Sequence, residues 1–144
     1  MMTSCPTLRI ATADDASTLD SLNAVFNGSS DGPEAIMKRI ADPRRVDIPL
    51  LAEVDGQVAG FACLRIVPNL FYPEPYAELT ELYVEPDHRR RGVGRALVAF
   101  AEELAKEKGA KSMKILTGDD NEAALGLYRG MVYENDDISL WKRL

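Results

Sequence analysis

The chain has 144 residues, which is the size of one domain. Its hydrophobic content of 46% and charged content of 28% are those of a folded globular protein, so we expect a single domain over residues 1–144. A formal net charge of −6 disfavours a general binder of nucleic acid or anionic membranes, and two cysteines with one histidine disfavour a zinc site, so no metal is expected. No apolar run reaches the ~20 residues that span a bilayer and the N-terminus lacks the pattern of a signal peptide, so we expect a cytoplasmic protein.

The first half of the chain predicts a strand, two helices and a β-hairpin. In chain order these are a strand over 7–12, a helix over 13–26, a helix over 33–42, and two strands over 48–54 and 57–67. Pro33 stands at the first position of the second helix, where proline is favoured, and Pro43 ends that helix. Asp55-Gly56 is the strongest short turn signal in the chain, so the two strands are expected to pair as a hairpin.

The second half predicts strands that alternate with helices, the pattern of a parallel crossover. The expected elements are a strand over 77–84, a helix over 92–107, a strand over 111–116, a helix over 121–129 and a final strand over 138–144. Val93, Leu97, Phe100 and Leu104 are spaced four, three and four residues apart, so they form one buried stripe on the long helix. Together the elements predict an α/β fold with helices on both faces of a mixed sheet.

The stretch DHRRRGVGRAL, from Asp87 to Leu97, concentrates positive charge between a strand and a helix. Without its four arginines the chain keeps 13 basic residues against 23 acidic ones. Free N–H groups at a helix N-terminus bind anions, and Gly92 and Gly94 let a ligand approach the backbone, so the stretch predicts a phosphate or diphosphate site. A dinucleotide fingerprint fails because Leu97 stands at the third glycine position, and no Gly-Lys-Ser/Thr follows for a P-loop. The alternative is an exposed basic turn whose glycines serve packing.

Two blocks of sequence resemble the GNAT superfamily of N-acetyltransferases. Arg89-x-x-Gly92-x-Gly94 is similar to its acyl-CoA signature, Gln/Arg-x-x-Gly-x-Gly/Ala, and about 30 residues later Asn121-x-x-Ala124-x-x-Leu127-Tyr128 resembles its later helix. The resemblance implies a mixed, mostly antiparallel sheet of six to seven strands. About four helices would flank this sheet around a central parallel βαβ crossover.

The resemblance also implies that acetyl-CoA is a co-substrate, bound at the arginine-glycine turn and along the edge of the preceding strand. The residues implied in this binding are Leu82, Tyr83, Val84, Arg89, Arg90, Arg91, Gly92, Val93, Gly94, Arg95 and Asn121. In the family, a bulge and a splay between neighbouring strands open this edge. The acetyl group would pass directly to a primary amine of a small molecule or peptide.

Three residues are candidates for the proton transfers that this reaction needs. Tyr128 stands at the family's position for the general acid that protonates the leaving thiolate. Glu78 and Glu81 are candidate bases, either directly or through water, because a carboxylate with a pKa near ~4.3 is a weak base for an amine near ~10.4. Strand alternation places the two glutamates on opposite faces, so only one is expected to face the acceptor. Nothing in the sequence pairs a base with Cys63, which disfavours an acyl-enzyme.

Alternatives to catalysis are a non-catalytic acyl-CoA-binding or regulatory domain and, less favoured by the charge, a nucleic-acid module. The resemblance implies that the acceptor lies against the first two helices, residues 13–42, and the loop over 68–76. The acidic surface favours a cationic amine. The resemblance further implies a homodimer, with the last strand as the candidate interface.

Val132 departs from the family, which usually has glycine at this position after the helix. If the backbone there has a positive φ, a β-branched valine is costly. Otherwise Gly130 forms the turn or the helix ends differently.

Overall fold

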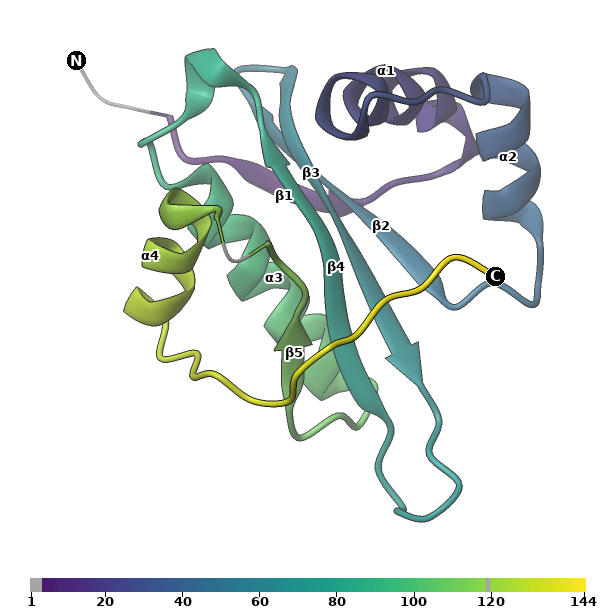
Figure 1. The fold of residues 1–144 in the computed structure, drawn as a ribbon. Helices are drawn as coiled ribbons and strands as arrows, with labels where there is room; N and C mark the ends of the chain where they lie inside the picture. Colours follow the sequence, from purple (N-terminus) through teal and green to yellow (C-terminus); the bar gives the residue numbers. More distant parts are fainter. Residues whose placement is uncertain (1–3, 119) are drawn as a thin grey trace.

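The computed structural model describes residues 4–118 and 120–144 and is built around one five-stranded sheet in the order β1-β2-β3-β4-β5 (Figure 1). The strands are β1 (Thr7–Ile10), β2 (Asp47–Val54), β3 (Gln57–Val67), β4 (Tyr76–Val84) and β5 (Met113–Ile115). Neighbouring strands are antiparallel, except β4 and β5, which are parallel. The α/β class and the parallel crossover are therefore confirmed. The expected six or seven strands are wrong, because the described residues form five.

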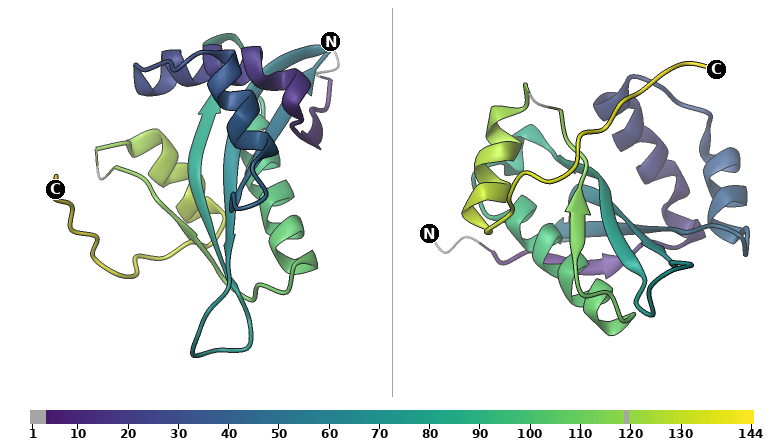
Figure 2. Two further views of the ribbon diagram at one scale, coloured as in Figure 1. Left: turned by 90° about the vertical axis from the view of Figure 1, so that its right-hand side faces the viewer. Right: turned by 60° about the horizontal axis from the view of Figure 1, so that its bottom comes forward.

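Four helices cover the two faces of this sheet (Figure 2). They are α1 (Ala16–Asn27), α2 (Pro33–Ala41), α3 (Val93–Glu107) and α4 (Glu122–Gly130), with short 3-10 turns at Ala13–Asp15 and Pro86–His88. Pro33 opens α2 as its position predicts. None of the described helices combines the length and apolar character needed to cross a bilayer.

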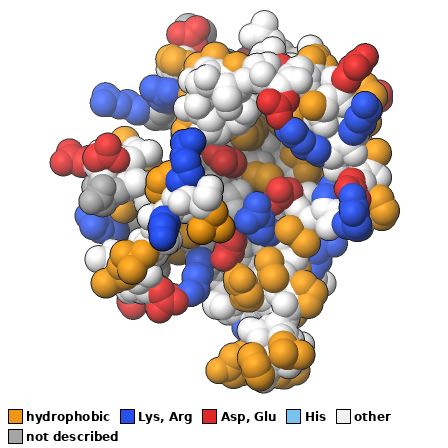
Figure 3. Space-filling model, turned by 45° about the vertical axis from the view of Figure 1, so that its right-hand side comes forward, with side chains coloured by type: hydrophobic (Ala, Val, Ile, Leu, Met, Phe, Trp, Pro, Cys, Tyr) orange, Lys and Arg blue, Asp and Glu red, His pale blue; other side chains and the backbone are white. Residues whose placement is uncertain are grey.

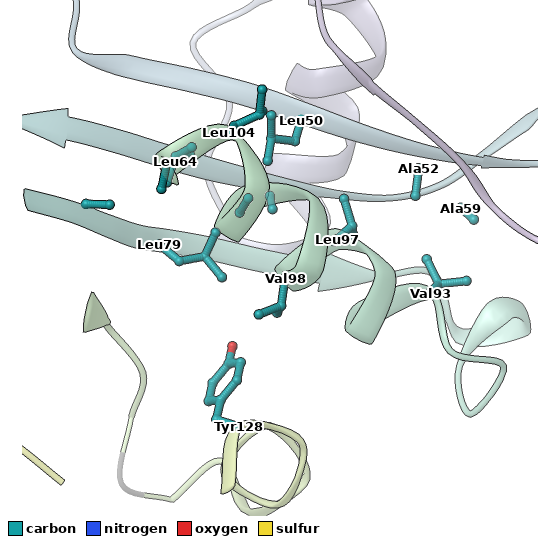
Figure 4. Packing of buried hydrophobic residues seen from close by; sticks show 14 of the residues in the cluster. Leu50, Ala52, Ala59, Leu64, Leu79, Val93, Leu97, Val98, Leu104 and Tyr128 are labelled. Carbon is teal, nitrogen blue, oxygen red and sulfur yellow. The ribbon is translucent and has the colours of Figure 1, made fainter. Parts of the chain in front are cut away.

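Two hydrophobic cores hold these layers together. The larger core lies between the sheet, α3 and α4, and includes the fully buried Leu50, Leu64, Leu79, Leu97 and Val98 (Figure 4). The stripe predicted on α3 is confirmed, because Val93, Leu97 and Leu104 are buried there and Phe100 packs against them. The smaller core lies under α1 and α2 and includes Leu19, Leu22, Phe61 and Tyr83.

A β-bulge in β4 changes which way its side chains point. Glu81 pairs with Cys63 and Leu79 pairs with Leu64, so Thr80 is one extra residue in β4, and its hydroxyl donates to the Cys63 carbonyl at 3.4 Å. Leu79 lies in the larger core and Tyr83 in the smaller one, although strict alternation would place both on one face. The prediction that Glu78 and Glu81 point to opposite faces is therefore wrong: both point toward the α1–α2 side.

The C-terminal tail, residues 131–144, follows α4 without a further helix or strand, so the strand expected over 138–144 is wrong. The side chains of Asp136 and Asp137 form ion pairs with Lys114 of β5 at 3.3 and 2.6 Å. The tail then leaves the short β5 and extends away from the sheet, so that the C-terminus projects from the rest of the molecule (Figure 2). The contact with β5 is thus made by side chains, and a strand needs backbone pairing along an edge.

The end of α4 shows which of the alternatives for the backbone at Val132 is correct. Val132 has a φ of 72°, the left-handed conformation usually taken by glycine. The Tyr133 N–H donates to the Tyr128 carbonyl and the Val132 N–H to the Arg129 carbonyl, both at 3.0 Å. These two hydrogen bonds form a Schellman motif with Val132 at its left-handed position, so Gly130, inside the helix, does not form the turn.

We expect Val132→Gly to raise the free energy of unfolding by about 1 kcal/mol, because a left-handed backbone costs an L-residue about that much. For a chain of this size the midpoint of thermal unfolding should rise by about 2–4 °C. The matched control is Val46→Gly, at an exposed valine without a positive φ, where glycine should leave stability unchanged or lower it. A loss of stability in Val132→Gly would contradict strain at this position.

Candidate active site

The edge of β4 that faces β5 is open over its second half. β5 pairs only with Ala77–Leu79, and the last bond across the two strands runs from the Leu116 N–H to the Leu79 carbonyl at 3.0 Å. Beyond the bulge the Glu85 N–H donates to Ala59 of β3, so strand alternation turns the backbone groups of Leu82 and Val84 toward the open edge. The structure therefore has the free strand edge that the sequence resemblance implies.

Arg89 and Tyr83 hold the end of this open edge in place. Nε of Arg89 donates to the Val84 carbonyl at 2.9 Å, and its guanidinium lies 5.7 Å from the centre of the Tyr83 ring. The Tyr83 ring itself is buried beside Phe26 and Phe61 in the smaller core. Arg89 thus anchors the turn to β4, and the Tyr83 side chain packs on the α1 side, away from the larger core.

The start of α3, after the turn that follows β4, has backbone donors without intrahelical partners. Ala96 is the first α3 residue whose N–H donates within the helix, to the Gly92 carbonyl at 3.0 Å, so the N–H groups of Val93, Gly94 and Arg95 lack intrahelical acceptors. Gly92 has a φ of 80°, and a Cβ added there would meet nothing within 4 Å. Unpaired donors next to open space, at the positive end of a helix dipole, suit a diphosphate.

The second glycine has a different role from the first. A Cβ added at Gly94 would lie 3.2 Å from Cδ2 of Leu127 and 3.7 Å from Cγ2 of Val84. Gly94 therefore allows α3 to pack closely against α4, whereas Gly92 faces open space. Of the two explanations for these glycines, ligand approach fits Gly92 and packing fits Gly94.

The remaining arginines surround this turn. Arg90 has a φ of 61°, and both Arg90 and Arg91 are exposed. Nη2 of Arg95 lies 3.5 Å from the position of a Cβ added at Gly130, so its charge is near the negative end of the α4 dipole. His88, in the preceding 3-10 turn, has a buried Nδ1 without a hydrogen-bond partner among the described residues.

α4 positions Asn121 and Tyr128. Oδ1 of Asn121 accepts from the Ala124 N–H at 3.2 Å, so this oxygen caps the helix. Tyr128 is buried in the larger core, and its hydroxyl points toward Val98 of α3 (Figure 4). Burial raises the pKa of the Tyr128 phenol, which is therefore neutral at ordinary pH and able to donate a proton.

A hollow of about 530 Å³ lies between the α1–α2 pair and the sheet (Figure 3). Its wall includes the apolar side chains Leu19, Ile36, Ile40 and Phe61. Glu81 also lines this hollow, which we call the acceptor cleft, and its Oε2 accepts from Nδ2 of Asn27 at 3.3 Å. Glu78 pairs in register with Arg65 and is outside the lining. The structure thus brings only one of the two candidate bases to the cleft.

Cys63 lines the cleft as well, but as a thiol and not a thiolate. Burial, with a smaller contribution from the charge of Asp47, raises the pKa of Cys63 to about 12. The protonated thiol is a poor nucleophile, which agrees with the sequence argument against an acyl-enzyme. The described residues contain no group of three side chains arranged to hold a metal ion.

The charged rim of the cleft was missed by the sequence analysis. Arg39, Asp42, Arg45 and Asp47 all line it, at the end of α2 and the start of β2. They lie in a connection without a recognisable motif, so only the folded structure shows that they face Glu81.

Residues 17–131 match the acetyltransferase (GNAT) family, and the chain belongs to this family. It is 32% identical over 99 residues to an acetyltransferase of Pectobacterium atrosepticum, covering 68% of this chain and 66% of that protein. It is 30% identical over 139 residues to the mycothiol acetyltransferase of Clavibacter sepedonicus, covering 92% and 44%. The chain spans about two fifths to two thirds of the length of the curated relatives it matches first.

Solved structures share the fold over nearly the whole chain. A putative acetyltransferase from Agrobacterium tumefaciens is 26% identical with a TM-score of 0.84, covering 96% of this chain and 99% of that one. An aminoglycoside acetyltransferase from a soil metagenome, in complex with sisomicin, is 18% identical with a TM-score of 0.83, covering 96% of both chains. An aminoglycoside N-acetyltransferase in complex with CoA is 19% identical with a TM-score of 0.81, covering 99% and 97%.

The different roles of the two glycines predict the effect of charge at Gly92. Asn and Asp both tolerate a left-handed backbone and have the same shape, so Gly92→Asn and Gly92→Asp differ almost only in charge. We expect Gly92→Asp to bind acetyl-CoA at least about tenfold more weakly than Gly92→Asn in calorimetric titration, because its carboxylate would repel the diphosphate. Equal affinities in the two variants would show that the diphosphate does not bind at this turn.

Proposed function

We propose that the chain is an acetyl-CoA-dependent N-acetyltransferase that acts on a primary amine of a small molecule or peptide. The observation that supports this best is the position of the Thr80 bulge between two surfaces. On one side of β4, the open edge leads directly to the donor-rich turn before α3. On the other side, Glu81 faces the acceptor cleft. A donor and an acceptor bound to these two surfaces would meet at the bulge.

The residues at the first surface fit the chemical groups of acetyl-CoA, which supplies the acetyl group as an activated thioester. The N–H groups of Val93, Gly94 and Arg95 bind the diphosphate, and the side chains of Arg90 and Arg91 attract it. The backbone groups of Leu82 and Val84 pair with the amides of the pantetheine arm, as a strand would. Arg89 and Asn121 support this surface by anchoring the turn and capping α4.

Glu81 is the proposed general base and Tyr128 the proposed general acid. The half-buried Glu81 carboxylate accepts the proton of the amine, directly or through water. Glu78 lies opposite Arg65 on the same face and is proposed to be a bystander. The buried Tyr128 hydroxyl holds a proton that it can give to the leaving thiolate.

Three substitutions separate these roles. Glu81→Gln and Tyr128→Phe should each lower turnover about a hundredfold, the usual contribution of a general base or acid, and should leave acetyl-CoA affinity unchanged. Glu78→Gln is the matched control and should keep turnover close to wild type, because its side chain lies outside the cleft. Turnover is measured by thiol release with a panel of amines, and affinity by calorimetry.

The outcomes distinguish this proposal from the alternative of a non-catalytic acyl-CoA-binding domain. Acetyl-CoA binding without thiol release on any amine would favour the regulatory domain. Full activity in both glutamine variants would eliminate a carboxylate base, and unchanged turnover in Tyr128→Phe would show that the tyrosine is structural.

We also propose that two copies associate through the C-terminal tail. Ile138, Leu140 and Trp141 are 88%, 92% and 82% exposed, an unusual concentration of large apolar side chains. Ile138, Leu140 and Leu144 recur with the period of a strand, and β5 is an edge strand of the described sheet. Addition of the tail to β5 of a second copy would place Ile138, Leu140 and Leu144 on one face of the extended sheet and Trp141 on the other, so that side chains on both faces leave water.

Trp141 is the only tryptophan, so its emission reports directly on this association. We expect light scattering to show a dimer and the emission to shift to shorter wavelength as protein concentration rises, because the indole leaves water. Leu140→Asp should abolish both effects. A monomer with the emission of an exposed tryptophan at all concentrations would overturn the dimer.

A further inference from the structure

Some of the charged side chains that line the acceptor cleft form salt bridges, and others do not. Five charged side chains line it: Arg39, Asp42, Arg45, Asp47 and Glu81. Three of these form salt bridges with residues outside the lining: Arg39 with Asp31 at 2.5 Å, Asp42 with Arg44 at 2.9 Å and Asp47 with Arg65 at 2.7 Å. The two that remain are Arg45 and Glu81, one of each sign.

Arg45 is fixed beside the start of β2, where it lines the cleft, without losing its charge. Its Nε donates to the Ile40 carbonyl at 2.5 Å and its Nη1 to the Asp47 carbonyl at 2.6 Å. Both acceptors are neutral backbone groups, and no carboxylate of the described residues lies within salt-bridge distance of Arg45. A guanidinium held in one orientation, with donors left over, is suited to bind an anion.

Glu81 is the opposite charge, on the β4 side of the cleft. It is half-buried, and its hydrogen-bond donor is the neutral amide of Asn27. Glu81 lies opposite Cys63, which lies opposite Pro49, so two strand spacings separate Glu81 from β2, a distance of about 10 Å. Arg45 is bonded to Asp47 at the start of β2, and the apolar Ile36, Ile40 and Phe61 line the space between the charges.

We propose that the acceptor is an amine that also carries an anionic group, a carboxylate or a phosphate, joined to the amine by an apolar spacer. The ammonium end is attracted to Glu81 and the anion binds Arg45, while the spacer lies against the apolar wall. Amines with a second positive charge are disfavoured, because that charge would meet the uncompensated Arg45. This inference rests on the proposed function and specifies the substrate class of the same site.

The test compares matched six-carbon amines in the thiol-release assay with acetyl-CoA. The probes are 6-aminohexanoate, 6-aminohexyl phosphate, hexylamine and 1,6-diaminohexane. We expect the kcat/KM of one of the two anionic probes to be at least about tenfold higher than that of hexylamine and of the diamine. This ratio corresponds to the contribution of one hydrogen-bonded charge pair. Whichever anionic probe has the higher kcat/KM identifies the anion. Arg45→Glu should reverse the preference in favour of the diamine.

A reversal of preference separates anion binding from a structural role of Arg45. Loss of its bonds to Ile40 and Asp47 would lower the activity on all four probes together, whereas only loss of anion recognition changes their ratio. Lys38→Gln on α2 removes one exposed positive charge outside the cleft and should leave the ratio unchanged. An unchanged ratio in Arg45→Glu, or a wild-type preference for hexylamine or the diamine, would overturn the inference and leave the acetyltransferase proposal standing.

Calorimetric titration of the anionic probes supplies a readout that does not need turnover. Binding that is lost in Arg45→Glu, without thiol release on any amine, would support the anion site and refute the proposed activity. Absence of both binding and turnover with the anionic probes would overturn the inference, whatever the other amines show.

Discussion

The β-bulge at Thr80 decides which groups of β4 reach each side of the sheet. If Thr80 held an ordinary place in the pleat and formed no bulge, strict alternation would turn Glu81 away from the face that carries Glu78, and the cleft would lose its one uncompensated carboxylate. The bulge also coincides with the point where β4 and β5 separate, since their pairing ends at Leu79. With the bulge at Thr80, the same strand has an open edge on one side and a cleft-facing acid on the other.

The packing of α3 against α4 extends this arrangement to the second half of the site. Gly94 in the first turn of α3 lies beside Val84 at the end of β4, so the unpaired N–H groups of α3 lie close to the backbone groups along that edge. Gly94 lets Leu127 approach within van der Waals contact, and Tyr128, the next residue, is thereby buried against α3. The glycine motif has two consequences: Gly92 leaves room for a ligand, and Gly94 sets the position of the tyrosine.

Local signals in the sequence predicted most of the fold. The stripe on α3, the turn at Asp55-Gly56 and the proline at the start of α2 each depend on neighbouring residues, and the structure has all three. The family resemblance implies a bulge at this edge, but the face of Glu81 could not be predicted, because the position of the bulge depends on the register between β3 and β4 and Thr80 carries no signal of it. The sequence also does not show which charged side chains of the cleft lack a salt-bridge partner. Arg39 and Arg44 form salt bridges and Arg45 does not, a difference that only the folded structure shows. The tail has the alternating pattern of a strand, but periodicity alone does not make a strand, because the tail pairs with no strand edge within the described chain.

Val132 shows how strain and burial are balanced at the end of α4. A valine in the left-handed region costs about 1–2 kcal/mol. Against this cost stand the two hydrogen bonds of the Schellman motif and the edge-to-face contact of the Tyr128 and Tyr133 rings, with centroids 6.2 Å apart, each contributing about 1 kcal/mol. The carbonyl that accepts from the Tyr133 N–H belongs to Tyr128 itself. The strained exit therefore fixes the backbone of the residue that is proposed to deliver the proton, and relief of the strain by glycine should preserve that geometry, because glycine adopts the same φ without cost.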